Sequence, residues 1–120
     1  MRLPVVLDAS ALVALFDAEP TAMAYFNLAA AGTRWLILPT AAIADAGQQL
    51  QAPAEAWAGI LLEEFAEVAP LTESIATEVG SWQGSVTTRH VIYEAREYGS
   101  PVLTRTPEHY SPGRVPLLVF

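Results

Sequence analysis

The chain has no lysine and no cysteine, and its only basic residues apart from two histidines are six arginines among 120 residues. Without cysteine it can form neither a disulfide nor a cysteine-bound zinc site, and it has no thiolate nucleophile. Without lysine it lacks both the amine that forms Schiff bases and the side chain that holds phosphates in P-loop proteins. The sequence alone therefore excludes these chemistries.

Positive charge is scarce and is concentrated in the last third of the chain. Thirteen acids against six arginines give a net charge of −7. Residues 1–80 hold ten acids and two arginines, whereas residues 81–120 hold three acids and four arginines. Such a chain does not coat nucleic acid by bulk charge, although a bound divalent cation reverses the sign at a carboxylate cluster. We expect any contact with a polyanion to lie in residues 81–120.

Apolar residues make up 52% of the sequence, which is enough for one hydrophobic core and predicts a single domain over residues 1–120. Short apolar runs at 3–7, 35–38, 68–69, 101–104 and 115–120 are typical of strands. Helical segments alternate with these runs, which predicts an α/β fold with helices on both faces of a parallel sheet of four to five strands. The first run is too short to cross a membrane, so we expect a cytoplasmic protein without a membrane partner.

Proline, glycine and capping residues mark the expected helices. These are 11–16, 20–31, 40–51, 53–62, 72–80 and 86–98. Thr40 and Thr72 are placed to cap two of them. In the last helix the spacing of Val91 and Ile92 predicts a buried face, and Glu94 is expected to point away from it.

Asp8 is the most informative residue, because it directly follows the first apolar run. In parallel α/β folds, function gathers beyond the carboxyl ends of the strands. Three chemistries place an aspartate there. A phospho-receiver domain also needs a lysine, and a haloacid-dehalogenase site needs a second aspartate where Ser10 stands. A metal-dependent nuclease needs only clustered carboxylates with Mg²⁺ or Mn²⁺.

Three segments resemble the motif blocks of the PIN-domain family, the fold of the VapC ribonuclease toxins. Val5–Leu15 is similar to the opening strand, aspartate and helix of that family. Leu38–Ala46 resembles its second block, a proline followed by a helix that carries an acid, and His90–Pro107 resembles its third block, a helix, Gly-x-Pro and a strand ending in threonine. The resemblance implies a PIN-like three-layer α/β/α sandwich.

The resemblance also implies a site of four acids, of which this chain keeps two. Asp8 and Asp45 match, and they are the expected ligands of Mg²⁺ or Mn²⁺. Thr88 and Thr106 stand where the third and fourth acids are usual. Because hard divalent cations prefer anionic oxygen ligands, two carboxylates should hold the metal only weakly.

Other polar residues are candidates to support this site. Ser10 is placed to orient Asp8, and Thr104 ends its strand nearby, although each could instead be a plain cap or a backbone-bonded hydroxyl. Glu108 lies two residues after Thr106 and is the better substitute for a lost acid, since Glu94 is on another side of its helix.

The function implied by the resemblance is Mg²⁺-dependent endoribonuclease cleavage by the toxin of a toxin–antitoxin pair. Its partners would be RNA, a small antitoxin protein and a second copy of the chain. The homodimer is expected through the apolar helix that carries Met23, Tyr25, Phe26 and Leu28. The rival interpretation is a non-catalytic PIN-like module that binds RNA or a protein.

Arginines stand beside both substituted positions. Arg89 follows Thr88 and Arg105 precedes Thr106, so both are candidates for contact with RNA phosphates. His90 is a further candidate for phosphate contact. The alternatives for Arg89 and His90 are a solvated helix start or pairing with acids of the same chain, and such pairing is also the alternative for Arg105. Trp82, in an expected loop, is a candidate for stacking on a base.

Overall fold

The protein is described by a computed structural model that covers residues 2–120. Its strands are β1 (Leu3–Leu7), β2 (Arg34–Pro39), β3 (Ala66–Ala69), β4 (Val102–Thr104) and β5 (Leu117–Val119). Its α-helices are α1 (Ala9–Phe16), α2 (Pro20–Ala30), α3 (Thr40–Leu50), α4 (Ala58–Leu61), α5 (Glu73–Val79) and α6 (Val86–Tyr98). Two 3₁₀ helices, η1 (Ala54–Trp57) and η2 (Pro107–His109), lie between them. Within residues 2–120, no helix is both long and apolar enough to cross a membrane.

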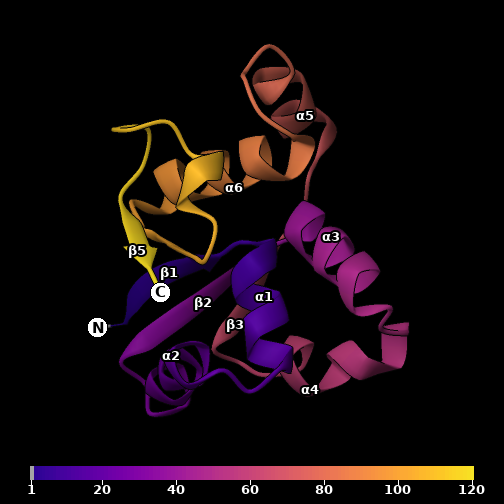
Figure 1. Ribbon diagram of the computed structural model, residues 1–120, viewed down its shortest axis with the longest axis vertical. Helices are drawn as coiled ribbons and strands as arrows, with labels where there is room; N and C mark the ends of the chain where they lie inside the picture. The colour runs from indigo at the N-terminus through magenta and orange to yellow at the C-terminus, as the bar shows by residue number, and fades with distance from the viewer. Residues whose placement is uncertain (1) are drawn as a thin grey trace.

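The strands form one parallel sheet in the order β3-β2-β1-β4-β5, flanked by the helices (Figure 1). This confirms the predicted α/β fold, with the higher of the two expected strand numbers. β1 pairs with β2 on one side and with β4 on the other. The chain proceeds outward from β1 to β3 and then returns to β4, so the carboxyl ends of β1 and β4 face the crevice where open α/β sheets bind ligands.

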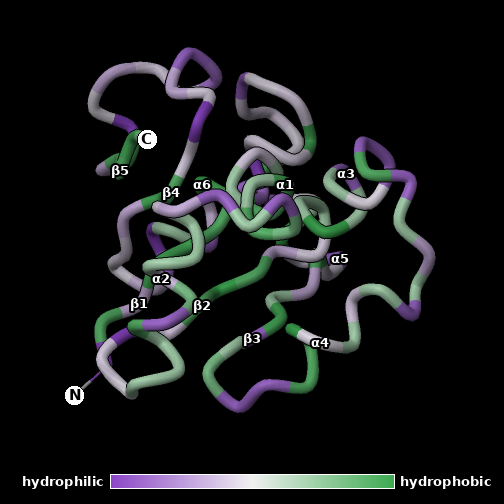
Figure 2. The backbone as a smooth tube through the Cα atoms, turned by 60° about the horizontal axis from the view of Figure 1, so that its bottom comes forward, coloured by the Kyte–Doolittle hydropathy of each residue, from purple (hydrophilic) through white to green (hydrophobic). Residues whose placement is uncertain are grey.

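The central strands are continuous apolar runs because both faces of the sheet are covered. Val5, Val6 and residues 36–38 are fully buried, and the trace in Figure 2 is accordingly hydrophobic along the middle of β2. Leu12 from α1 and Ile92 from α6 are part of the same core. This packing fixes the strand ends from which the polar residues project.

The structure corrects two of the predicted helices. Thr40 does not cap α3, since Pro39 holds the cap position without a side-chain hydrogen bond, and the Thr40 hydroxyl instead accepts from the Leu71 N–H at 2.9 Å. The helix expected over 53–62 is split into η1 and the single turn α4. Gly59 weakens helix formation there, and Trp57 is anchored in the core with its ring 4.6 Å from that of Phe16.

The expected bounds of the last two helices are close to the observed ones. Thr72 caps α5, where its hydroxyl accepts from the Ile75 N–H at 3.2 Å. Ser85 caps α6 through the Thr88 N–H at 3.1 Å. Gly99 ends α6 with a φ of +60°, a conformation that glycine adopts without strain.

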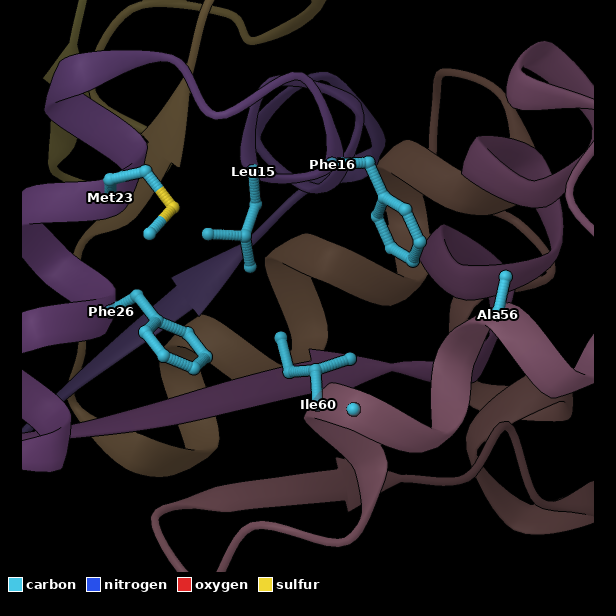
Figure 3. Close-up of a pocket in the computed structure, with 7 residues that line it drawn as sticks. Leu15, Phe16, Met23, Phe26, Ala56 and Ile60 are labelled. Carbon is cyan, nitrogen blue, oxygen red and sulfur yellow. The ribbon is translucent and has the colours of Figure 1, made fainter.

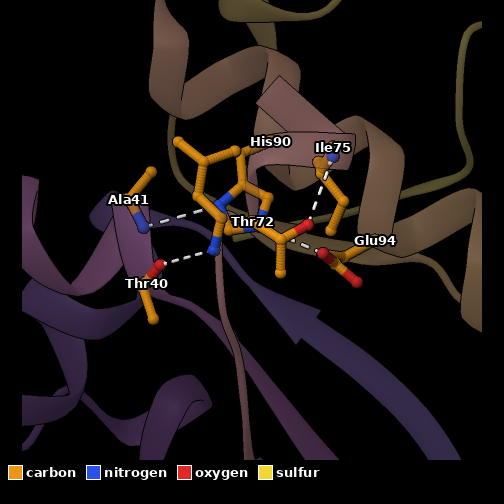
Figure 4. A network of polar contacts seen from close by, with 7 residues as sticks. Thr40, Ala41, Thr72, Ile75, His90 and Glu94 are labelled. Carbon is orange, nitrogen blue, oxygen red and sulfur yellow. Dashed lines mark hydrogen bonds and ion pairs between the residues drawn. The ribbon is translucent and has the colours of Figure 1, made fainter. Parts of the chain in front are cut away.

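Glu94 does not point away from the core, and this prediction was wrong. Figure 4 shows His90 between Ala41 and Glu94, with the imidazole fully buried. The Ala41 N–H donates to Nδ1 at 3.4 Å, which leaves the ring proton on Nε2, 3.0 Å from Glu94 Oε2. Burial lowers the pKa of His90 to about 4 and, with nearby Glu97, raises the pKa of Glu94 to about 7. The pairing with His90 satisfies the buried carboxyl group, and a helical pattern taken alone cannot reveal that.

Candidate functional site

One pocket at the carboxyl edge of the sheet collects most of the predicted site residues. Its volume is about 150 Å³, and its lining includes Asp8, Ser10, Asp45, Thr88 and Thr106. Residues not singled out from the sequence also line it, namely Ala9, Gln49, Ser85, Thr87, His109 and Tyr110. The five expected residues come from the β1–α1 junction, from α3, from the start of α6 and from the segment after β4. The four positions where the PIN resemblance places acids therefore meet in one pocket.

Asp8 lies at the floor of this pocket, 3% exposed, and caps α1. Its Oδ1 accepts from the Ser10 hydroxyl at 2.6 Å and from the Ala11 N–H at 3.0 Å. Its Oδ2 accepts from the Tyr110 hydroxyl at 2.8 Å. Both carboxylate oxygens thus accept hydrogen bonds from the chain itself.

Tyr110 is the contact that sequence reasoning missed. It is buried and follows η2, and burial together with the Asp8 charge raises the pKa of its phenol. The phenol therefore stays protonated and acts as a donor. A buried tyrosine hydroxyl usually needs a hydrogen-bond partner. The partner of Tyr110 lies 102 residues away in the sequence, so tertiary packing and not the local sequence pattern determines it.

Hydroxyl groups join the ends of β1 and β4. The Ser10 hydroxyl accepts from the Arg105 N–H at 2.9 Å while it donates to Asp8. Thr104, which is fully buried, accepts from the Thr106 N–H at 2.9 Å, and its Oγ1 lies 3.4 Å from Ser10 Oγ. Ser10 therefore orients the Asp8 carboxylate, and Thr104 supports this arrangement from behind the pocket.

Asp45 and Thr88 reach the pocket from its other side. Asp45, half-buried on α3, lines the pocket. Thr88, almost fully buried at the start of α6, accepts a hydrogen bond from the Ser85 hydroxyl at 3.1 Å. The hydroxyl of Thr88 thus belongs to the capping structure of α6 as well as to the pocket.

The donor set does not fit a tight site for a hard divalent cation. Across residues 2–120 the structure brings no three His, Asp or Glu side chains together as a possible metal-binding group. Asp8 and Asp45 are the only carboxylates among the residues lining this pocket, so it offers two anionic side chains to a cation. Glu108, the expected substitute, is exposed and does not line the pocket, because η2 presents Tyr110 inward.

The two candidate arginines have different environments. Arg89 donates from Nη1 to the carbonyls of Val79 and Gly80, at 3.2 and 3.1 Å, and so holds the carboxyl end of α5. Arg105 precedes the pocket residue Thr106 and is exposed, with its guanidinium 5.2 Å from the centre of the Phe120 ring. Its charge is one of the causes that lower the pKa of Glu19, after the backbone hydrogen bond from Ala22. Neither is paired with an acid, since among residues 2–120 His90–Glu94 is the one contact within 4.0 Å between a basic side chain and a carboxylate. Arg105 is therefore the freer of the two.

No protein-family model matches this chain, and no curated protein matches it.

Proposed function

We propose that this chain is a VapC-like PIN-domain protein that binds single-stranded RNA and does not cleave it efficiently by the metal-dependent route. The observation that carries this proposal is the meeting of Asp8, Asp45, Thr88 and Thr106 in one pocket at the switch point of a parallel sheet. The positions are those of a four-acid nuclease site, and two of the acids are threonines. A place for a phosphodiester remains, whereas most of the charge that would hold a metal is missing.

Two side chains at the pocket supply hydrogen-bond donors for a phosphate. Thr106 offers a hydroxyl, and the exposed guanidinium of Arg105 supplies charge-assisted donors beside it. The charge of Asp8 is compensated by three hydrogen bonds, which reduces its repulsion of a phosphate. These donors favour a bound phosphate, so binding is the activity that this part of the pocket supports.

Metal-dependent endoribonuclease cleavage is the second candidate function. The observation in its favour is that Asp8 and Asp45, the two expected ligands, share the pocket. As a VapC-like protein, the chain would also bind a small antitoxin protein, and a neighbouring short reading frame encoding such a protein would support this partner.

Arg105→Gln is expected to weaken binding of a single-stranded oligoribonucleotide several-fold and to lower the salt slope by about 0.7, the loss of one phosphate contact. Fluorescence anisotropy at a series of salt concentrations measures both quantities. Arg34→Gln is the matched control, because Arg34 begins β2 at the opposite edge of the sheet and also lies over an aromatic ring.

Unchanged affinity and slope in Arg105→Gln would contradict the proposed contact. Metal-dependent cleavage by the wild type that Asp8→Ala abolishes would replace the proposal with the second candidate. Arg89→Ala is a poor test, since it removes the two hydrogen bonds at the end of α5 and is expected to lower stability.

The homodimer is also part of this proposal. An apolar groove of about 230 Å³ lies beside α2 (Figure 3). It is lined by Leu15, Phe16, Met23, Phe26, Ala56, Gly59 and Ile60. Phe26 packs on Phe65 at 5.2 Å, so part of the apolar excess of α2 is internal, but Leu28 is 43% exposed. An exposed apolar surface of this kind favours association between copies.

Light scattering at tens of micromolar is expected to give twice the 12.9 kDa mass of the chain. Met23→Glu should shift the mass to that of a monomer, because it places a charge in the apolar groove. Val119→Glu, at an exposed residue of edge strand β5, is the control that should leave the dimer intact. A monomer mass for the wild type would rule the dimer out.

A further inference from the structure

Two arginines converge on one tryptophan away from the Asp8 pocket. Arg96, in the last turn of α6, and Arg114, before β5, lie with their guanidinium carbons 5.2 and 5.9 Å from the centre of the Trp82 ring. Together with Ser81 and Gln83 they line a pocket of about 350 Å³. The tertiary structure thus unites the α5–α6 loop, the end of α6 and the segment before β5.

The two guanidinium groups are positioned but largely unused. Arg96 donates from Nη2 to the Arg114 carbonyl at 3.4 Å, and Arg114 donates from Nη1 to the Gln83 carbonyl at 3.2 Å. A guanidinium has five N–H donors, so most of them remain free for a ligand. The indole face adds a cation–π attraction that helps to hold both groups in place.

No acid of this acidic chain neutralises the pair. In residues 2–120 neither guanidinium lies within 4.0 Å of a carboxylate oxygen, although the chain has thirteen acids. Both arginines line the same pocket, so a doubly charged anion bound there would be attracted by two positive charges. The pocket is therefore suited to an anion of charge near −2.

We propose that this pocket binds a phosphate monoester, supplied either by a free nucleotide or by the 5′-phosphorylated end of an RNA strand. A monoester carries about −1.5 to −2 at neutral pH, which matches two guanidinium groups better than the single charge of a backbone phosphodiester or a carboxylate. Arginine also fits phosphate oxygens with two parallel hydrogen bonds. None of the five lining residues belongs to the Asp8 pocket, so this is a second site beyond the proposed function.

The loop between α5 and α6 connects the two sites. Ser81, Trp82 and Gln83 line the arginine pocket, and Ser85 lines the Asp8 pocket. A strand whose 5′ phosphate is held by Arg96 and Arg114 would therefore begin at a loop that also lines the Asp8 pocket.

The test compares ligands that differ only in the phosphate. Uridine 5′-monophosphate, uridine and inorganic phosphate are titrated by calorimetry, and a short oligoribonucleotide is compared by anisotropy with a 5′-phosphate and with a 5′-hydroxyl. We expect at least one phosphorylated ligand to bind about tenfold more tightly than its unphosphorylated counterpart. A gain for the nucleotide alone identifies the free-nucleotide source, and a gain for the oligonucleotide identifies the RNA end.

Arg96→Gln and Arg114→Gln should each remove the gain, and Arg34→Gln, which takes a charge from another arginine over an aromatic ring, should leave it unchanged. Melting curves establish that the variants are folded. Equal affinity for phosphorylated and unphosphorylated ligands in the wild type, or a gain that persists in both variants, would overturn the proposal. Weak binding of the 5′-hydroxyl strand would count against the proposed RNA binding but not against the phosphate monoester site, because the nucleotide titration tests that site without RNA.

Discussion

Replacement of Thr88 and Thr106 by aspartate is expected to raise the affinity for Mg²⁺ by roughly 100-fold or more, because the charge count of the ligands sets the affinity of a hard cation. Both threonines line the pocket that contains Asp8 and Asp45. The double variant therefore doubles the number of carboxylates in one place. Aspartate is close to threonine in size, so the pocket can accept it with little repacking.

The same variant should depend on the cation for stability. Four carboxylates in a small pocket repel one another, which raises their pKa values and destabilises the fold without metal. Mg²⁺ that binds the folded state alone then restores stability in proportion to its concentration. We expect the melting temperature of the double variant to fall below that of the wild type and to recover with millimolar Mg²⁺.

Titration calorimetry and thermal melting measure these two effects. Thr33→Asp with Thr77→Asp is the matched control, since it adds the same charge at two exposed threonines outside the pocket. Addition of Asp8→Ala to the Thr88→Asp/Thr106→Asp variant should remove the gain. Equal Mg²⁺ affinity in wild type and double variant would show that the site lies elsewhere, and saturation of the wild type at low micromolar Mg²⁺ would show that another group completes it.

His90→Ala is expected to lower the free energy of unfolding by about 3–5 kcal/mol, a large part of the ~5–15 kcal/mol typical of a domain. The imidazole has no exposed surface, so its removal leaves a cavity in the core. It also leaves Glu94 buried without its donor at 3.0 Å. Urea unfolding measures the change, and a loss below about 1 kcal/mol, the scale of a typical point substitution, would contradict the role assigned to the pair.

The pair also predicts a specific dependence of stability on pH. The folded-state pKa of His90, about 4, lies below its usual 6.5, so the stability that it contributes is complete above pH 6.5 and is lost as the pH falls toward 4. The folded-state pKa of Glu94, about 7, lies above its usual 4.5, so its contribution is complete below pH 4.5 and is lost as the pH rises toward 7. In the wild type the two slopes oppose each other between pH 4.5 and 6.5.

Glu94→Gln should expose the histidine slope, with stability that falls clearly from pH 6.5 to 4.5. Unfolding curves at several pH values test this, and Glu55→Gln, at an exposed glutamate of η1, is the control. If the stability of Glu94→Gln changed with pH in the same way as that of the wild type, the titration of Glu94 would not be offsetting that of His90.

The sequence by itself determined the fold class and the location of the candidate site. Buried parallel strands need apolar residues on both faces, so runs such as 3–7 and 35–38 mark them directly. Helix ends are encoded within a few residues, as Ser85 and Gly99 show for α6. The resemblance of the motif blocks named Asp8, Asp45 and the two threonine positions, and these four residues line one pocket.

Only the tertiary structure decided how those residues are used. It gave Asp8 a tyrosine donor from 102 positions away, directed Glu108 outward and engaged Arg89 at the end of α5. It buried Glu94 against His90 and joined Arg96 and Arg114 at Trp82. Such contacts depend on which side chains the packed core leaves facing one another. Periodicity and capping signals, which act over a few neighbouring residues, carry no information about them.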